Sequence, residues 1–165
     1  INQEIFDSLI PAELQNRDLT RDITRAEFCA VSVRLYEQMG GQKLDAAALD
    51  SPFADTGSDA VKKAYALGIT NGVSPTAFAP YTHISREQLA TMLWRYDGSP
   101  APSADTVMDF PDLADLSTWA ADAMTWAVDQ KIVQGYNGTL IPREPAIRGQ
   151  VAAMLWRYLG SPLWV

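Results

Sequence analysis

Three segments of the chain, which we call the motif segments, repeat one pattern of hydrophobic and polar positions. They are Ile23–Tyr36, Ile84–Tyr96 and Ala146–Tyr158. In the second and third, large apolar side chains recur at i, i+3, i+4 and i+7, which is the spacing of one face of an α-helix. In the first, Ser32 takes one of these positions. Each segment therefore predicts a helix that buries one stripe, and the spacings of 61 and 62 residues between copies indicate three near-equal units.

A column of small residues lies on the same stripe and consists of Cys29, Ala90 and Ala152. Small side chains in a buried stripe allow helix axes to approach closely. We therefore expect an all-α fold, mainly helical with short loops and hairpins, in which three equivalent helices pack about one axis and share a core. Since Cys29 lies on this stripe, we expect a buried structural thiol rather than a nucleophile.

The starts of these helices carry capping signals. Thr24 and Glu27 form a capping box, in which the hydroxyl accepts from the amide three residues on and that residue's side chain accepts from the cap amide. Ser85 and Gln88 repeat this box. The third copy has Ile147 at the cap position, so we expect that helix to begin differently.

Two columns of arginine run through the motif segments. Arg25, Arg86 and Arg148 lie in the first helical turn, where the macrodipole disfavours a cation by about 0.3–1 kcal/mol. Two explanations stay open: an ion pair with a carboxylate from a neighbouring unit, or an anion site built from helix amides and a guanidinium. The second column lies near the helix C-termini, where we expect solvated or dipole-matched cations. It consists of Arg34, Arg95 and Arg157.

Each of the two later units predicts a shorter helix before its motif segment. Ser58 or Asp59 is expected to cap a helix that runs through Leu67. Its inward positions are Val61, Ala64, Tyr65 and Gly68. Ser117 is expected to cap a helix over Trp119–Lys131.

The two later units also contain aromatic and acidic residues that could either pack and cap helices or bind a ligand. We expect Trp119 and Trp126 to pack in the core rather than to line a carbohydrate groove, whereas both readings stay open for Tyr136, which lies in a loop. Asn137-Gly138 predicts a tight hairpin there. Four aspartates are expected to act as caps and turns before helices, because their spacing lacks the glycine and terminal glutamate of a Ca²⁺ loop. They are Asp55, Asp109, Asp112 and Asp115.

The sequence ITRAEF, followed by an apolar helix, resembles the signature of the S-layer homology (SLH) module. Residues 109–160 are similar to that family's pattern throughout: an F-x-D start, a W-A helix, a G-Y-x-x-G-T-x-x-P loop and the motif helix. Residues 52–98 depart from it by lacking the W-A pair and by having NGVSPTAFAP as the loop. We therefore expect SLH repeats at 1–41 (partial), 52–98 and 109–160, all three forming one compact unit.

The resemblance implies a pseudo-threefold spindle with a central three-helix bundle. It also implies noncovalent anchoring of an exported protein to the bacterial cell wall, through secondary cell-wall polysaccharide with a pyruvylated amino-sugar terminus. The first-turn arginine would meet the pyruvate carboxylate in grooves between repeats, with help from neighbouring motif residues and from the glycine-containing loops. The ligand-binding residues so implied are Arg25, Arg86, Arg148, Thr24, Ser85, Glu27, Gln88, Gln150, Gly72, Gly135 and Tyr136.

Composition argues against three other classes of protein: nucleic-acid-binding proteins, membrane-inserted proteins and enzymes. The formal net charge of −7 and pI near 4.6 argue against nucleic acid as a partner, because such a partner needs a basic face. No apolar run approaches the length of a membrane span, so we expect no membrane insertion. With one cysteine and one histidine, no nucleophile–base pair or metal cluster stands out, and we expect neither an enzyme nor a cofactor.

The resemblance also implies a location at the cell surface or cell wall, so we expect a part of an exported protein whose signal peptide is not in this fragment. The alternative is a helical module for protein–protein interaction or self-assembly at the cell surface. That alternative predicts a mass that rises with concentration in light scattering and indifference to wall polysaccharide.

Overall fold

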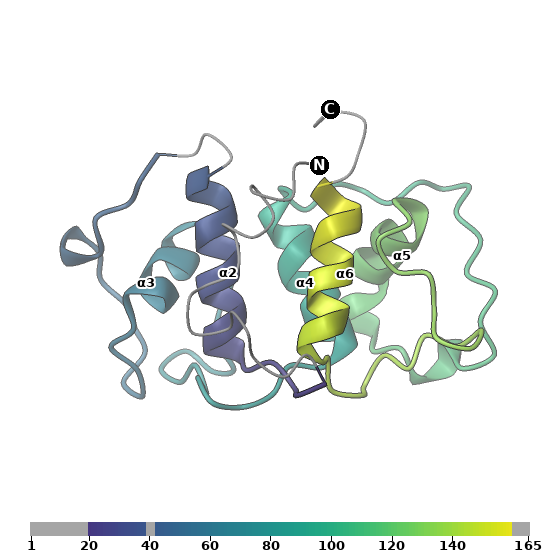
Figure 1. The fold of residues 1–165 in the computed structure, drawn as a ribbon, viewed down its shortest axis with the longest axis horizontal. Coiled ribbons are helices and arrows are strands. Elements are labelled where there is room, and N and C mark those ends of the chain that lie inside the picture. The colour runs from purple at the N-terminus through teal and green to yellow at the C-terminus, as the bar shows by residue number, and fades with distance from the viewer. Residues whose placement is uncertain (1–19, 39–41, 160–165) are drawn as a thin grey trace. The chain divides into compact units, whose positions relative to one another are not determined.

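A computed structural model describes residues 20–38 and 42–159 (Figure 1). Residues 1–19 of the predicted partial repeat 1–41 lie outside this description, as does the side chain of Ala152. The described ranges hold helices and isolated bridges without a named strand, which confirms the all-α prediction. The elements are α2 (Arg25–Gln38), η1 (Ala46–Ala48), α3 (Asp59–Ala66), α4 (Arg86–Tyr96), η2 (Leu113–Asp115), η3 (Thr118–Ala120), α5 (Ala121–Asp129) and α6 (Arg148–Leu159), where η denotes a 3₁₀ helix. Across the described residues, no helix has the length and apolar character needed to cross a bilayer.

The chain divides into two compact units, whose described residues are 23–38 and 42–83 in the first unit and 20–22 with 84–159 in the second. In the first unit α2 packs on α3, and in the second α4 packs on α5. The motif helices α2 and α4 therefore pack with the shorter helix of the following sequence repeat, so the structural units are offset from the repeats. The pseudo-threefold arrangement of the three motif helices stays a prediction.

The stripes predicted for the motif helices are buried. Phe28 and Leu35 of α2 are 0% and 1% exposed, and Leu89 and Leu93 of α4 are 1% and 2% exposed. Cys29 is also buried, and burial raises the pKa of its thiol to about 12. The prediction of a structural rather than a nucleophilic cysteine agrees with this environment, because the thiolate is the reactive form.

The capping box predicted at α4 is present in full. The Gln88 amide donates to the Ser85 hydroxyl at 3.2 Å, and the Ser85 amide donates to Gln88 Oε1 at 2.9 Å. At α6, half of the box persists without a hydroxyl, because the Ile147 amide donates to Gln150 Oε1 at 3.1 Å. The start of α6 therefore differs from that of α4 in lacking a side-chain hydroxyl that accepts from the third residue's amide. The bond from the cap amide back to the glutamine side chain is kept.

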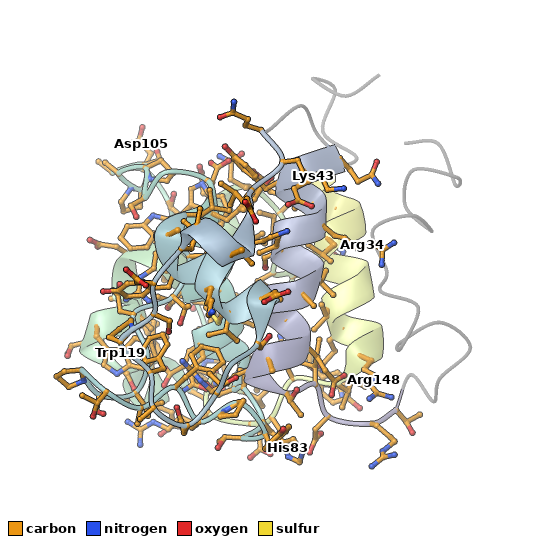
Figure 2. All side chains as sticks on the ribbon, turned by 90° about the vertical axis from the view of Figure 1, so that its left-hand side faces the viewer. Arg34, Lys43, His83, Asp105, Trp119 and Arg148 are labelled. Carbon is orange, nitrogen blue, oxygen red and sulfur yellow. The ribbon has the colours of Figure 1, made fainter. Side chains whose placement is uncertain are left out.

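The shorter helices required three corrections. Tyr65 is 39% exposed and Gly68 is also exposed, so neither is central, although Ser58 caps α3 as expected. Trp126 is buried as predicted, but Trp119 is 55% exposed and not in the core; Figure 2 labels its position. The cause is a 3₁₀ turn over Thr118–Ala120 before α5, which changes the angular spacing of side chains and buries Ala120 instead.

The third correction concerns Ser117, which makes no capping bond at the start of this turn. Its hydroxyl instead donates to Glu87 Oε1 at 2.7 Å, and its amide donates to Glu87 Oε2 at 3.0 Å. Glu87 lies in the first turn of α4 and is 4% exposed. A buried carboxylate requires donors, so Ser117 joins the start of the third repeat to α4.

Candidate ligand site

In each unit, an aspartate of the F-x-D sequence holds a loop by two backbone amides. Asp112 accepts from the Leu140 amide at 3.0 Å and from the Ile141 amide at 2.8 Å. Asp55 accepts in the same way from Phe78 and Ala79, at 2.9 and 2.8 Å. These hydrogen bonds from backbone amides lower the pKa of both aspartates. The sequence predicted caps and turns for Asp55 and Asp112. Asp112 is the N-cap residue of η2, but its side chain makes no cap bond there; both carboxylates bind the loop that precedes the next motif helix instead.

The loop held by the aspartate also receives the first-turn arginine. Arg86 Nε donates to the Leu140 carbonyl at 3.0 Å, and Arg25 Nε donates to the Phe78 carbonyl at 2.8 Å. The Arg25 guanidinium also lies over the Phe78 ring, 4.8 Å from its centroid. The two arginines are 8% and 6% exposed. The sequence left two explanations open for these arginines, an ion pair and an anion site. Neither included a backbone carbonyl as the partner of Nε.

A cavity of about 160 Å³ opens beside Arg86 in the second unit. It is lined by the first turn of α4, the loop after α5 and one face of α6. The lining residues are Arg86, Ile132, Val133, Gln134, Gly135, Tyr136, Gln150, Ala153, Met154 and Arg157. Four residues predicted as ligand contacts thus meet at one cavity, namely Arg86, Gly135, Tyr136 and Gln150.

Two cationic side chains, those of Arg86 and Arg157, line this cavity. Burial lowers the pKa of Arg86 and the nearby Arg157 lowers it further, while Asp112 acts in the opposite direction. Arg157 is exposed and donates from Nη1 to the Ile132 carbonyl at 3.1 Å. Within the described residues, no hydrogen bond engages the two Nη groups of Arg86. Guanidinium groups donate charge-assisted hydrogen bonds to carboxylates.

Two loops require glycine, at Gly72 in the first unit and at Gly135 in the second, because the backbone φ is positive and an added Cβ would meet close neighbours. Gly135 has φ +86°, and a Cβ there would lie 3.1 Å from the Thr139 carbonyl oxygen and 3.3 Å from the ring of Phe110. Gly72 has the same conformation in the first unit, with φ +79°. Tyr136, which follows Gly135, is 59% exposed. The hairpin predicted at Asn137-Gly138 is confirmed by the paired bonds between Tyr136 and Thr139.

The other predicted contacts lie elsewhere. Thr24 accepts from the Glu27 amide at 3.1 Å in the first unit, which also contains Gly72. Ser85 and Gln88 form the capping box of α4 and are absent from the cavity lining. Arg148 lies at the first turn of α6 (Figure 2), where its amide donates to the Arg21 carbonyl at 2.8 Å. In the part of the chain that the structure describes, no group of three acidic, histidine or cysteine side chains suits a metal ion.

Sequence reasoning missed two contributors to this site. The sequence predicted Arg157 as a solvated or dipole-matched cation; it is exposed, and it also lines the cavity. Asp112 was expected to be a cap, yet it holds the loop that contacts Arg86. Both residues recur at matching positions of other repeats, Arg157 with Arg95 and Asp112 with Asp55. That recurrence was the available signal.

Replacing Ser85 with alanine tests whether this residue serves the helix or the ligand. We expect Ser85→Ala to lower the free energy of unfolding by about 1 kcal/mol, because one cap bond is lost. Since Ser85 does not line the cavity, we expect ligand affinity to stay within about twofold of wild type, a difference below about 0.5 kcal/mol. Urea unfolding and calorimetric titration measure the two quantities, and a large loss of affinity at unchanged stability would contradict the structural role.

Comparison with known proteins agrees with the sequence resemblance. The sequence model of the S-layer homology domain matches residues 52–90 and 109–152. An endoglucanase of Bacillus sp. (strain KSM-635) is 30% identical over 149 residues, which cover 84% of this chain and 15% of the endoglucanase. The chain thus spans a small part of that relative. The matched family segments contain Asp55, Arg86 and Asp112, whereas the predicted repeat at 1–41 lies outside them.

Proposed function

The chain belongs to the S-layer homology domain family, and from this premise we propose that the cavity beside Arg86 binds an acidic terminus of secondary cell-wall polysaccharide. Domains of this family are binding modules that anchor proteins to the cell wall, which implies a location at the cell surface. The specific sugar and its acidic group are the proposal.

One observation carries this proposal: two arginines and no acidic side chain line the cavity, in a chain of net charge −7. Burial is the main cause of the lowered pKa of Arg86, and repulsion from the nearby Arg157 lowers it further. A carboxylate bound there would reverse the repulsion. Each charge-assisted hydrogen bond would contribute about 1.5–3 kcal/mol.

The remaining lining suits a pyruvate ketal on an amino sugar. Such a ketal presents a carboxylate beside a methyl group, and Val133 and Met154 provide apolar wall next to the arginines. Tyr136 offers an exposed ring on which a sugar face can pack, since carbohydrate faces carry apolar C–H groups. Gln150 and the backbone at Gly135 supply polar contacts for the sugar.

We extend the proposal to the equivalent residues of the other motif helices. Arg25, with Thr24, Glu27 and Gly72, would serve a second site, and Arg148 would serve a third. In the third, Ile147 offers no hydroxyl, so we expect the weakest binding there. Several sites engaged by one polymer would raise the apparent affinity through effective concentration.

The first test is sedimentation with cell-wall sacculi before and after chemical removal of the secondary polymer. We expect binding only before removal.

Arg157→Ala should weaken binding to the purified polymer by about tenfold, the factor that follows from losing about 1.4 kcal/mol. Arg143→Ala is the matched control, because Arg143 is an exposed arginine of the same unit outside the cavity lining; it should leave affinity unchanged.

Two results would count against the proposal. Equal sedimentation with stripped sacculi would exclude the secondary polymer as the ligand. A mass that rises with concentration in light scattering, together with indifference to the polymer, would favour self-assembly instead.

A further inference from the structure

We propose that Asp112 is a positioning residue for ligand binding, because its carboxylate fixes the loop carbonyl that orients the Arg86 guanidinium in the cavity. Nothing in the family match assigns this role to it. The inference rests on the proposed function of the cavity, and the experiment below separates the two.

The contacts form a continuous chain through one loop residue. Asp112 Oδ1 accepts from the Leu140 amide at 3.0 Å, and the Leu140 carbonyl accepts from Arg86 Nε at 3.0 Å. The second carboxylate oxygen accepts from the Ile141 amide at 2.8 Å. Leu140 therefore transmits the position of the carboxylate on one side to the position of the guanidinium on the other.

The loop adopts a conformation that its sequence disfavours. Ile141 has φ +41°, which lies in the left-handed region and is unusual for a β-branched residue. Such a conformation persists only where the surrounding structure enforces it. The bond from the Ile141 amide to Asp112 is the side-chain contact that holds this residue, and backbone bonds from Glu144 to Ile141 and from Glu87 to Pro142 hold the rest of the loop. Without the bond to Asp112, we expect the loop to relax and the Leu140 carbonyl to move away from Arg86.

The same arrangement is repeated in the first unit with different loop residues. Asp55 binds the amides of Phe78 and Ala79, Ala79 has φ +57°, and the Phe78 carbonyl accepts from Arg25 Nε at 2.8 Å. Since Phe78-Ala79 and Leu140-Ile141 share no side chain, the geometry follows from the aspartate and the arginine and not from one particular loop sequence.

Asp112 does not form an ion pair with Arg86, although the two residues bind the same loop. Both carboxylate oxygens of Asp112 accept from amides, and within the described residues no ion pair joins it to Arg86. Its negative charge still favours the charged form of the arginine, whose pKa it raises against the effect of burial. Arg86 is thus oriented through Nε, while its side chain lines the cavity and its Nη groups make no hydrogen bond among the described residues.

The test is Asp112→Asn, which keeps the shape but leaves one amide without an acceptor. We expect the Nε proton of Arg86, followed by NMR without ligand, to exchange with water at least about tenfold faster, since its bond to Leu140 is weakened. Affinity for the purified wall polymer should fall about tenfold, as for the loss of one charge-assisted bond. Asp115→Asn is the control, because Asp115 is an exposed acid three residues away and should change neither quantity.

A double-mutant cycle with Arg86→Lys shows whether Asp112 acts through the arginine. We expect Asp112→Asn to have little further effect on affinity in the Arg86→Lys background, because coupled residues are not additive. Additive losses, or an unchanged exchange rate of Arg86 Nε in Asp112→Asn, would overturn the positioning role. If the unmodified protein fails to bind the polymer, the proposed function is wrong, while the exchange rate still decides whether Asp112 positions Arg86.

Discussion

Arg86→Gln should weaken binding of the wall polymer by more than about 100-fold, which corresponds to about 2.7 kcal/mol. The side chain lines the cavity, is 8% exposed, and has both Nη groups unengaged among the described residues. A carboxylate ligand would therefore receive two charge-assisted hydrogen bonds from it, each contributing about 1.5–3 kcal/mol. Glutamine keeps an amide near the Leu140 carbonyl but brings no charge. Calorimetric titration with purified polymer measures the effect.

Two companion variants make this result specific. Arg143→Gln removes the same charge from an exposed position of the same unit and should leave affinity unchanged, which separates a local contact from a change in net charge. Arg25→Gln removes the equivalent arginine of the first unit, so a loss there would show that its site contributes independently. If Arg86→Gln binds the polymer as tightly as wild type, the cavity is not the docking site.

Gly72→Ala should be among the most destabilising single changes in the first unit, lowering the free energy of unfolding by about 3 kcal/mol or more. The residue has φ +79°, which already costs an L-amino acid about 1–2 kcal/mol. In addition, its new Cβ would lie 2.8 Å from the Ala77 carbonyl oxygen and would overlap the ring of Phe53. Phe53 precedes Asp55 in the F-x-D sequence, so the clash would reach the loop that Asp55 holds.

Gly68→Ala is the matched control for this prediction. Gly68 lies in the same unit with φ +75°, but a Cβ there meets nothing within 4 Å. It should therefore show only the conformational cost of about 1–2 kcal/mol. Urea unfolding followed by circular dichroism compares the two variants. Equal losses would mean that the ring of Phe53 moves aside easily and that the glycine is needed only for its φ.

The sequence predicted those features that depend on neighbours within a few positions along the chain. Helical periodicity placed α2, α4 and α6 within two residues of their observed starts. The capping box of Ser85 and Gln88 and the hairpin at Asn137-Gly138 are formed by residues two to four apart, and they are present as predicted. The family signature is of the same kind, because it is a spacing of residue types along the chain.

The contacts that build the site could not be predicted, since they join residues far apart in sequence. Arg86 Nε meets the Leu140 carbonyl across 54 positions, and Asp112 meets the Leu140 amide across 28. A backbone carbonyl has no residue type that a sequence pattern can display. The arginine was therefore assigned to an acid or to a ligand, and the aspartate was assigned to the nearest helix.

By itself, then, the sequence determined the helices, their caps, the repeat and the family, because these arise from local preference and from the order of residue types. Only the tertiary structure decided that the first-turn arginine is held by a loop of the following repeat, that Asp112 holds this loop, and that Trp119 faces solvent. Packing fixes these outcomes, since a buried guanidinium or carboxylate must find a partner wherever the fold brings one within reach.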